Sequence, residues 1–157
     1  MDYLWAPWRF QYIQQEKPKG CILCDKPGQD NDRENYILFR GRLNFIMLNA
    51  FPYNPGHLLV APYRHAADLT VLTAGERAEH MDLLCRCVEV LRDEVKPAGF
   101  NLGSNLGKVA GAGIDDHFHS HVVPRWQGDT NLVTVLGDIR VVPQALLATY
   151  DALAGRF

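Results

Sequence analysis

The feature that most constrains this chain is a run of three histidines, His117, His119 and His121, which alternate strictly with other residues. Side chains of a β-strand alternate between its two faces, so this spacing predicts a strand that presents the three imidazoles on one face. The two valines that follow favour a strand, and Pro124 limits its length. Imidazoles in a row can bind a metal ion or carry out proton and phosphoryl chemistry near neutral pH. Burial for packing alone is less favoured, because burying several polar rings is costly.

Besides proton and phosphoryl chemistry on the histidines, the residues allow two other classes of function. In the first, the three histidines together bind a catalytic zinc ion. Against it, the first and third histidines of a strand lie about 13 Å apart at roughly 3.3 Å per residue, too far for one ion to reach all three without a bend. In the second, the chain is a non-catalytic nucleotide-binding module, which a trapped phosphohistidine adduct would exclude.

The length of the chain and its charge narrow the class of protein. A chain of 157 residues with 47% hydrophobic and 22% charged residues fits one globular domain with a real core. The formal net charge of -2 argues against a protein that binds a nucleic acid polymer. The N-terminus lacks the long apolar core of a signal peptide, and no apolar run approaches membrane-spanning length. We therefore expect a cytoplasmic protein with no membrane partner.

We predict a single domain over residues 1–157, made of an N-terminal arm (1–20), a core (21–126) and a C-terminal extension (127–157). The arm is aromatic and basic. Packing of its rings on the body of the protein or across a dimer is favoured over a role in substrate binding, because aromatic rings bury much area. Short β-rich runs bounded by turn residues predict strands at 36–40, 44–48, 57–61, 100–103 and 132–135.

A long helix is predicted from Thr73 to about Lys96. Thr73 and Glu76 match a capping box at its start, and a proline and a glycine follow its end. His80 on this helix is expected at the surface. The apolar residues at helical spacing, which are expected to face the core, are Met81, Leu84, Val88, Leu91 and Val95. A second helix is predicted at 143–154.

Cys21 and Cys24 form a CxxC pair, which can be a redox couple or half of a zinc site. A redox couple would need a strand–helix junction, whereas the flanking glycines and proline predict a loop, and a closing loop is how two thiolates chelate zinc. In a reducing compartment, cysteines more often bind metal or lie buried than form disulfides. Cys85 and Cys87 fall on the predicted long helix and are expected as small core or boundary residues.

Residues 104–113 form a glycine-rich loop that leads into the histidine run. The loop has neither the GxxxxGK[ST] order of a P-loop nor the GxGxxG order of a dinucleotide fold. Glycines let backbone N–H groups approach an anion closely, and adjacent N–H groups can form an anion-binding nest. A plain connection between strands is the alternative, but its place beside nucleophilic imidazoles favours a phosphate site.

Taken together, these motifs resemble the histidine triad family. The resemblance rests on residues 117–123 and on residues 44–49 and 54–62, which look like the family's nucleotide-binding hairpin. It covers most of residues 20–126. The N-terminal LWAPWR segment and the PRWQGDTN segment after the histidines look most like the bacterial branch that is similar to diadenosine tetraphosphate phosphorylases.

The resemblance implies an α+β fold with an antiparallel sheet, one long helix and a C-terminal helix, usually as a homodimer. It implies a hydrolase or transferase that cleaves dinucleoside polyphosphates through a nucleotidyl-histidine intermediate, by phosphorolysis or hydrolysis. A nucleoside phosphoramidate hydrolase is the alternative enzyme. Adenine is the family's usual base. Two positions depart from the family's pattern: Ser120 is usually apolar, and Gly113 stands where many members carry glutamine.

The resemblance also implies roles for single residues. His119 would be the nucleophile, with His117 and His121 completing the catalytic set, and Asn49 would bond the ribose hydroxyls. The nucleotide-binding residues implied are Asn49, His57, Asn105, Gly111, Gly113, His119 and His121. Some members carry zinc on a CxxC pair plus two histidines, which here implies a closed, structural site made of Cys21, Cys24, His65 and His117. We also allow for Mg²⁺ bound together with a polyphosphate substrate.

Overall fold

The computed structural model describes residues 20–129 and 144–157 of the chain. The packing expected for the N-terminal arm and the strand expected at 132–135 lie outside the described residues. The helices and strands of the described part follow in this order: α2 (Ile22–Asp25), α3 (Asp32–Asn35), β1 (Ile37–Arg40), β2 (Asn44–Leu48), β3 (Leu58–Pro62), the 3-10 helix η1 (Leu69–Val71), α4 (Ala74–Val95), β4 (Gly99–Gly103), the 3-10 helix η2 (Lys108–Ala110), β5 (Ser120–Arg125) and α6 (Leu146–Leu153).

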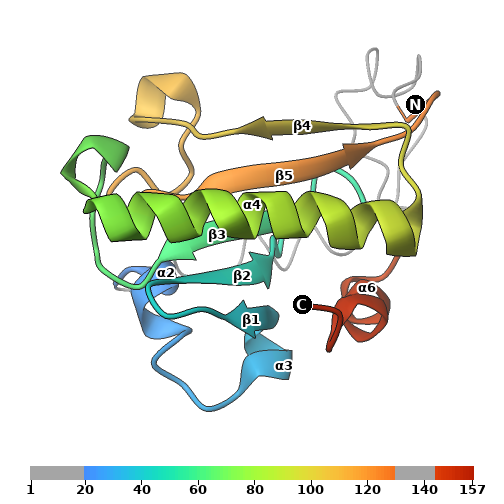
Figure 1. Cartoon of the computed structure of the whole chain (residues 1–157), viewed down its shortest axis with the longest axis horizontal. Helices are drawn as coiled ribbons and strands as arrows, with labels where there is room; N and C mark the ends of the chain where they lie inside the picture. Colours follow the sequence, from blue (N-terminus) through green and yellow to red (C-terminus); the bar gives the residue numbers. More distant parts are fainter. Residues whose placement is uncertain (1–19, 130–143) are drawn as a thin grey trace, which may run out of the picture.

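Five strands form one antiparallel sheet in the order β1-β2-β3-β5-β4, with the long helix α4 and the C-terminal helix α6 beside it (Figure 1). This confirms the predicted α+β class. The four strands predicted ahead of the histidines correspond to β1 to β4, with ends shifted by no more than one residue. Because β5 pairs with β3 on one side and β4 on the other, the segment that carries the histidines leads into the interior of the sheet.

The two faces of the sheet are buried by different elements. Alternate residues of β2 and β3 pack against α4 and α6, and the residues between them pack against Leu23 of α2. The side facing α4 holds Ile46, Leu48, Leu58, Val60 and Val122, and the opposite side holds Phe45, Met47, Leu59 and Ala61. Since Leu59 is the register partner of His121, this histidine lies on the face opposite α4.

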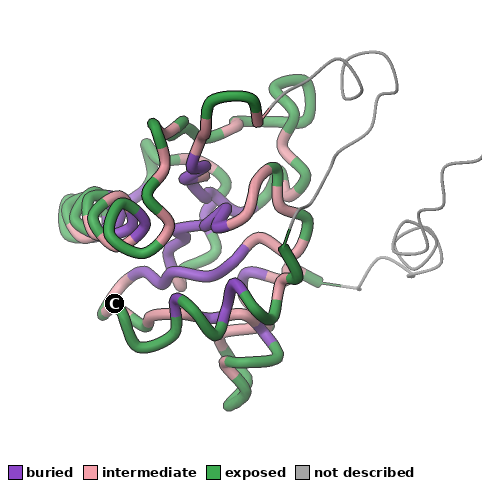
Figure 2. The backbone as a smooth tube through the Cα atoms, turned by 90° about the vertical axis from the view of Figure 1, so that its right-hand side faces the viewer, coloured by how far each residue is buried: buried purple, intermediate pink, exposed green. Residues whose placement is uncertain are grey.

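Helix α4 begins as predicted, with both hydrogen bonds of the Thr73–Glu76 capping box formed. Its buried side is turned from the predicted one: Met81 is 60% exposed, whereas His80 is buried. The expectations for these two residues were wrong. Burial of His80 is tolerated because its ring has two hydrogen-bond partners, and Leu84, Cys87 and Leu91 are buried on the same helix. Figure 2 shows that the buried side of the long helix faces the rest of the molecule and that its outer side is exposed.

The histidine run is less regular than predicted. Strand β5 begins at Ser120, so His121 lies on it, while His117 and His119 precede it. Continuing the register of β3 and β5, in which Val60 pairs with Ser120, would place Pro62 opposite Phe118, and Pro62 has no N–H to donate to the ladder. The N–H of Phe118 bonds instead to the carbonyl of Ala66, beyond the end of β3.

The CxxC segment forms one helical turn instead of the predicted loop. Cys21 is the N-cap of α2 and Cys24 lies within it. The predicted C-terminal helix is confirmed as α6, and its Leu153 lies in the core cluster. Of the two helical cysteines, Cys87 is buried and Cys85 is exposed. Among the helices of residues 20–129 and 144–157, none combines the length and apolar character that a bilayer span requires.

Candidate functional site

His119 is held by the backbone of its own segment. Its Nδ1 lies 2.9 Å from the carbonyl oxygen of His117, and because a carbonyl can only accept, Nδ1 carries the proton. Burial lowers the pKa of His119 below its ordinary value of 6.5, so the ring is neutral at pH 7 and the lone pair is on Nε2. The residue is 5% exposed, yet no fully buried side-chain nitrogen of the described residues lacks a partner. Nε2 of His119 has no hydrogen-bond partner among the described residues, so it must be a nitrogen that solvent can still reach.

His121 receives a hydrogen bond from His57. Nδ1 of His57 accepts the backbone N–H of Tyr53 at 3.0 Å, so the proton of the neutral His57 ring is on Nε2. That Nε2 lies 2.9 Å from Nδ1 of His121, which must accept. The proton of the neutral His121 ring is therefore on Nε2, and this tautomer is set by one backbone amide acting through a second imidazole.

The His121 and His119 rings stand edge to face, with centroids 5.0 Å apart. Burial, and the nearby His119, lower the pKa of His121 to about 4, so it is a neutral hydrogen-bond donor at pH 7. The ring of Tyr53 lies over both His57 and His121, with centroids 4.6 Å and 6.0 Å away. The structure thus places a lone pair on His119 beside an N–H on His121, next to the ring of Tyr53.

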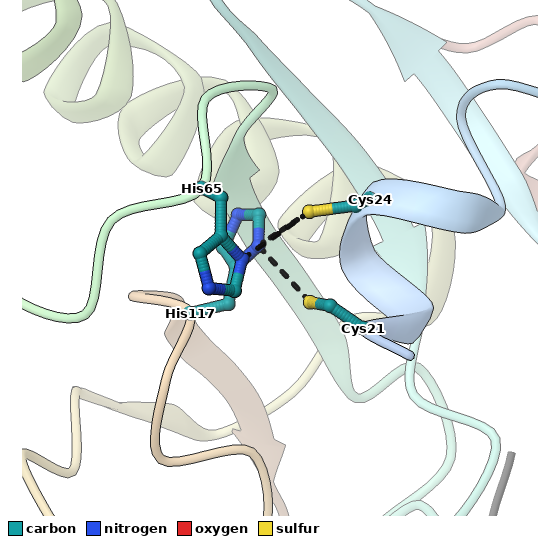
Figure 3. A group of neighbouring side chains, drawn as sticks. All are labelled: Cys21, Cys24, His65 and His117. Atoms are coloured by element: carbon teal, nitrogen blue, oxygen red, sulfur yellow. Dashed lines mark hydrogen bonds between the residues drawn. The ribbon is translucent and has the colours of Figure 1, made fainter. Parts of the chain in front are cut away.

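On the other side of His119, the ring of His117 belongs to a Cys/His cluster formed by Cys21, Cys24, His65 and His117 (Figure 3). The cysteines come from the turn of α2, His65 from the loop after β3, and His117 from the segment ahead of β5. One ligand atom from each of the four residues lies within 4.8 Å of the others. The sequence separates these residues by up to 96 positions, and the fold brings together all four residues that the resemblance implied.

The cluster fits a tetrahedral metal ion. Nδ1 of His117 lies 3.2 Å from Sγ of Cys21 and 3.3 Å from Sγ of Cys24, and Nδ1 of His65 lies 3.3 Å from Sγ of Cys24. A tetrahedral zinc ion at ordinary Zn–S and Zn–N lengths would separate such atoms by about 3.6 Å. Nε2 of His117 donates to the carbonyl of Pro62 at 2.8 Å, which turns the Nδ1 lone pair toward the sulfurs.

The protonation of the cluster also depends on a cation. Burial and the adjacent Cys21 raise the pKa of the Cys24 thiol to about 11, so without a positive charge it stays protonated at pH 7. Burial lowers the pKa of His117, which keeps its ring neutral and able to act as a ligand. A divalent cation would offset the cost of the thiolates.

The predicted nucleotide-binding residues fall into two groups. Asn49 and His57 lie with the histidines, because Nδ2 of Asn49 is 3.3 Å from Nδ1 of His57. In the glycine-rich loop, Nδ2 of Asn105 donates to the carbonyl of Gly111 at 3.3 Å, so this amide stabilises the loop itself. Gly111 has a φ of 90°, which favours glycine, and Gly113 is exposed. The contacts expected between a nucleotide and these residues stay predictions.

Two residues beside the histidines were not predicted from the sequence. Tyr53 lies in the turn-rich loop before β3, where its backbone amide and its ring both serve His57. His80 lies behind the segment, with its ring 5.1 Å from that of Phe118. The presence of a further histidine on an otherwise apolar helix face was the one signal in the sequence for His80.

Comparisons with known proteins agree with this geometry. A family model described as HIT domain matches residues 31–128. An "AP-4-A phosphorylase" of Mycobacterium tuberculosis is 40% identical, over 98% of this chain and 83% of that protein. A "Bis(5'-adenosyl)-triphosphatase" of Dictyostelium discoideum is 31% identical, over 62% of this chain and 64% of the relative. A solved zinc-bound histidine triad family protein from Mycobacterium smegmatis has 25% identity and a TM-score of 0.69, over 87% of this chain and 91% of that chain.

Proposed function

The chain belongs to the HIT domain family, the histidine triad family that its sequence resembles, and we propose that it is an enzyme that cleaves dinucleoside polyphosphates through a nucleotidyl-histidine intermediate. The observation that carries the proposal is the state of His119. Its Nδ1–H is used by the His117 carbonyl, so its Nε2 lone pair is available beside His121. The names of two relatives, an AP-4-A phosphorylase and a bis(5'-adenosyl)-triphosphatase, support the substrate class.

In the proposed first step, Nε2 of His119 attacks the α-phosphorus of the bound nucleotide. A bond forms between this nitrogen and phosphorus, and the bond from phosphorus to the bridging oxygen breaks, with the electron pair leaving on the remaining phosphates. The N–H of His121 stabilises charge on the non-bridging oxygens, together with backbone N–H groups of the glycine-rich loop. As positive charge develops on the His119 ring, its Nδ1–H bond to the His117 carbonyl becomes stronger.

In the second step, water or inorganic phosphate takes the nucleotide from His119. Phosphorolysis is the favoured course, because the relative that covers 98% of this chain is named a phosphorylase. Adenine is the favoured base, because one relative is named an AP-4-A phosphorylase and another a bis(5'-adenosyl)-triphosphatase. A nucleoside phosphoramidate hydrolase is the alternative enzyme, and a module that binds nucleotide without chemistry is the alternative of another class. Both alternatives use the same site, but the phosphoramidate hydrolase would break a phosphorus–nitrogen bond, whereas the binding module would break no bond.

The decisive experiment compares the intact protein with His119→Ala. Incubation with diadenosine tetraphosphate, with and without phosphate, should give ADP plus ATP in phosphate, and AMP plus ATP without it if water serves. The variant should lose turnover by at least about 10³-fold, because the nucleophile is gone, while nucleotide binding measured by calorimetry remains. A nucleotidyl-protein adduct trapped from the intact protein should be absent from the variant. Near-normal turnover by the variant would contradict the proposal.

We also propose that the Cys/His cluster holds a structural zinc ion. Its four donors form a closed set, and the structurally similar histidine triad protein from Mycobacterium smegmatis was solved with zinc bound. When bound, the ion would join α2, the loop after β3 and the histidine segment, which fixes the carbonyl that orients His119. The described residues offer one group that could hold a metal ion, and it is this cluster. Binding of Mg²⁺ together with the substrate's phosphates therefore stays a prediction.

We further propose a cytoplasmic homodimer. β4 is the last strand of the described sheet, and its free edge can pair with the same strand of a second copy across a two-fold axis. Beside it lies an apolar groove of about 250 Å³, lined by Met81, Leu84, Cys85, Val88 and Leu102 among others. Light scattering should give twice the monomer mass, and Leu102→Glu should give the monomer mass. A monomeric intact protein would contradict the dimer.

The proposed cytoplasmic location is supported by the thiol ligands of the cluster, which are compatible with a reducing compartment.

A further inference from the structure

His80 of α4 is a buried histidine for which the proposed chemistry has no use. It is 6% exposed, and it lies on the face of the sheet opposite the reactive rings. Burying an imidazole is costly unless both nitrogens are hydrogen-bonded, and here both are. Nδ1 lies 3.0 Å from Oδ1 of Asn44, and Nε2 lies 2.8 Å from Oγ of Ser120.

The tautomer of His80 follows from the amide of Asn44. Nδ2 of Asn44 lies 3.1 Å from the carbonyl oxygen of Glu76 and 3.1 Å from the carboxylate of Glu79. Both of these groups only accept, so the NH₂ group faces them and the amide oxygen faces His80. Nδ1 of His80 must therefore donate, and in the neutral ring Nε2 must accept. Burial lowers the pKa of His80 to about 4, which agrees with a neutral ring.

The direction of the remaining hydrogen bonds is then fixed. Ser120 donates its hydroxyl proton to Nε2 of His80. The hydroxyl oxygens of Ser104 and Ser120 lie 2.7 Å apart, and since the proton of Ser120 is already used, Ser104 is the donor. The result is a directed chain from Ser104 through Ser120 and His80 to Asn44. We call these four residues the His80 chain.

The chain crosses the point where two strands separate. β4 and β5 pair from Gly99–Arg125 to Gly103–His121, and continuation of this register would place Ser104 opposite Ser120. β4 ends at Gly103 and β5 begins at Ser120, so the hydroxyl–hydroxyl bond takes over where the strand pairing stops. Beyond Ser104 lies the glycine-rich loop, and before Ser120 lies the proposed nucleophile.

We propose that His80 is a positioning residue that, through Ser120 and Ser104, holds the glycine-rich loop and the segment bearing His119 at a fixed separation. The inference rests on the proposed function for its activity readout, and on the hydrogen bonds alone for its structural readout. Two elements that must act on one phosphate have to keep their spacing to within a fraction of an ångström, because misplacement by about 1 Å can cost on the order of 10²-fold in rate.

The polarity of the chain also assigns a role to Ser104. Its proton is given to Ser120, so it cannot donate to a phosphate oxygen unless the chain breaks. Although Ser104 stands at the entry of the loop, it serves the loop's position, and donation to phosphate is left to the backbone N–H groups and His121. Replacing Ser104 with alanine should therefore lower kcat and leave the affinity for nucleotide nearly unchanged.

The test compares four variants at a temperature where all are folded. His80→Leu removes both hydrogen bonds at similar volume, and should lower kcat by about 10- to 100-fold with a KM within about threefold. His80→Gln can supply one donor and one acceptor, and should restore at least half of that loss on a logarithmic scale. Ser120→Ala should act like His80→Leu, and the double variant His80→Leu/Ser120→Ala should be no worse than the more impaired single variant.

Leu83→Ala is the matched control. Leu83 lies one turn further along the same buried side of α4 and packs in the core, outside the His80 chain, so it lowers stability without touching Ser120. Its kcat should stay within about twofold of the intact protein. If His80→Leu kept the kcat of the intact protein, or if Leu83→Ala lost as much at equal stability, the positioning role would be refuted.

A spectroscopic readout separates this inference from the proposed function. The ¹⁵N shifts of His80 at pH 7 should show the Nδ1–H tautomer, and Ser120→Ala should move the shift of its accepting Nε2 more than that of Nδ1. An Nε2–H tautomer would overturn the inference whatever the activity. If His119→Ala remained active while His80 showed the expected tautomer, the function would fall and the hydrogen-bonded chain would stand.

Discussion

The two ends of the histidine segment carry the same residue type and receive opposite treatment. At one end, His117 is buried among two sulfurs and a carbonyl, and its lone pair is directed at the cluster. At the other end, His121 is half-buried, its lone pair is occupied by His57, and its N–H is left for a ligand. His119 between them donates its Nδ1–H to the carbonyl of His117, which leaves the lone pair of its Nε2 available.

The difference shows that spacing alone does not assign a role to a histidine. Which nitrogen of each ring carries the proton depends on partners that come from elsewhere: the CxxC turn and Pro62 for His117, and the loop before β3 for His121. We therefore propose that the first end serves the stability of the fold and that the second end serves the reaction. Variants at the two ends should therefore separate loss of folding from loss of rate.

The largest effect is expected at the cluster end. Cys24→Ser should lower the free energy of unfolding on the order of 4 kcal/mol, because a structural metal site contributes directly to folding. Zinc content by mass spectrometry should fall with it. Cys85→Ser is the matched control, since Cys85 is exposed, and it should change stability by less than about 0.5 kcal/mol.

A cluster that is only a set of hydrogen-bonded thiols would give another result. In that case chelator treatment of the intact protein would leave the unfolding midpoint unchanged, and Cys24→Ser would cost about 1 kcal/mol. Either observation would remove the distinction drawn between the two ends.

A smaller effect, in rate instead of stability, is expected at the His121 end. His57→Leu keeps a similar volume but removes the donor that sets the tautomer of His121, so kcat should fall by about 10- to 100-fold. Zinc content should be unchanged, which pairs this variant with Cys24→Ser. If His57→Leu instead lost zinc, or kept full kcat, the relay from Tyr53 to His121 would be wrong.

The last expected effect is a pH dependence of stability. His121 has an ordinary pKa of 6.5 and a folded pKa of about 4, so between these values the unfolded chain binds a proton that the folded protein does not. The free energy of unfolding should be highest above pH 6.5 and fall as the pH drops to 4, by at most about 1.4 kcal/mol per pH unit for this group.

Urea unfolding at pH 7.5 and 5.0 measures this fall, and His121→Gln should make it shallower because glutamine does not titrate. The comparison of variant with intact protein cancels the acid loss of metal at the other end. An identical pH dependence in both proteins would mean that His121 is protonated as easily when folded as when unfolded.

Much of the fold could be predicted because its signals are local. The capping box at Thr73 and Glu76, the strand ends next to turn residues, and the helix at the C-terminus each depend on neighbours in sequence. The four cluster residues were also named in advance, from resemblance, and the structure brings them together. The buried side of α4 was mispredicted at Met81 and His80, because apolar residues occur on two sides of that helix and only contact with the sheet selects one.

What the sequence determined by itself is the set of reactive groups: three histidines in alternation, a cysteine pair and a glycine-rich loop beside them. What only the tertiary structure decided is the protonation and direction of each group. A ring nitrogen donates or accepts according to the partner placed against it, and the partners of His80, His117 and His121 lie between 36 and 96 residues away along the chain. Hydrogen bonds act over about 3 Å in space, so separation along the chain gives no measure of them.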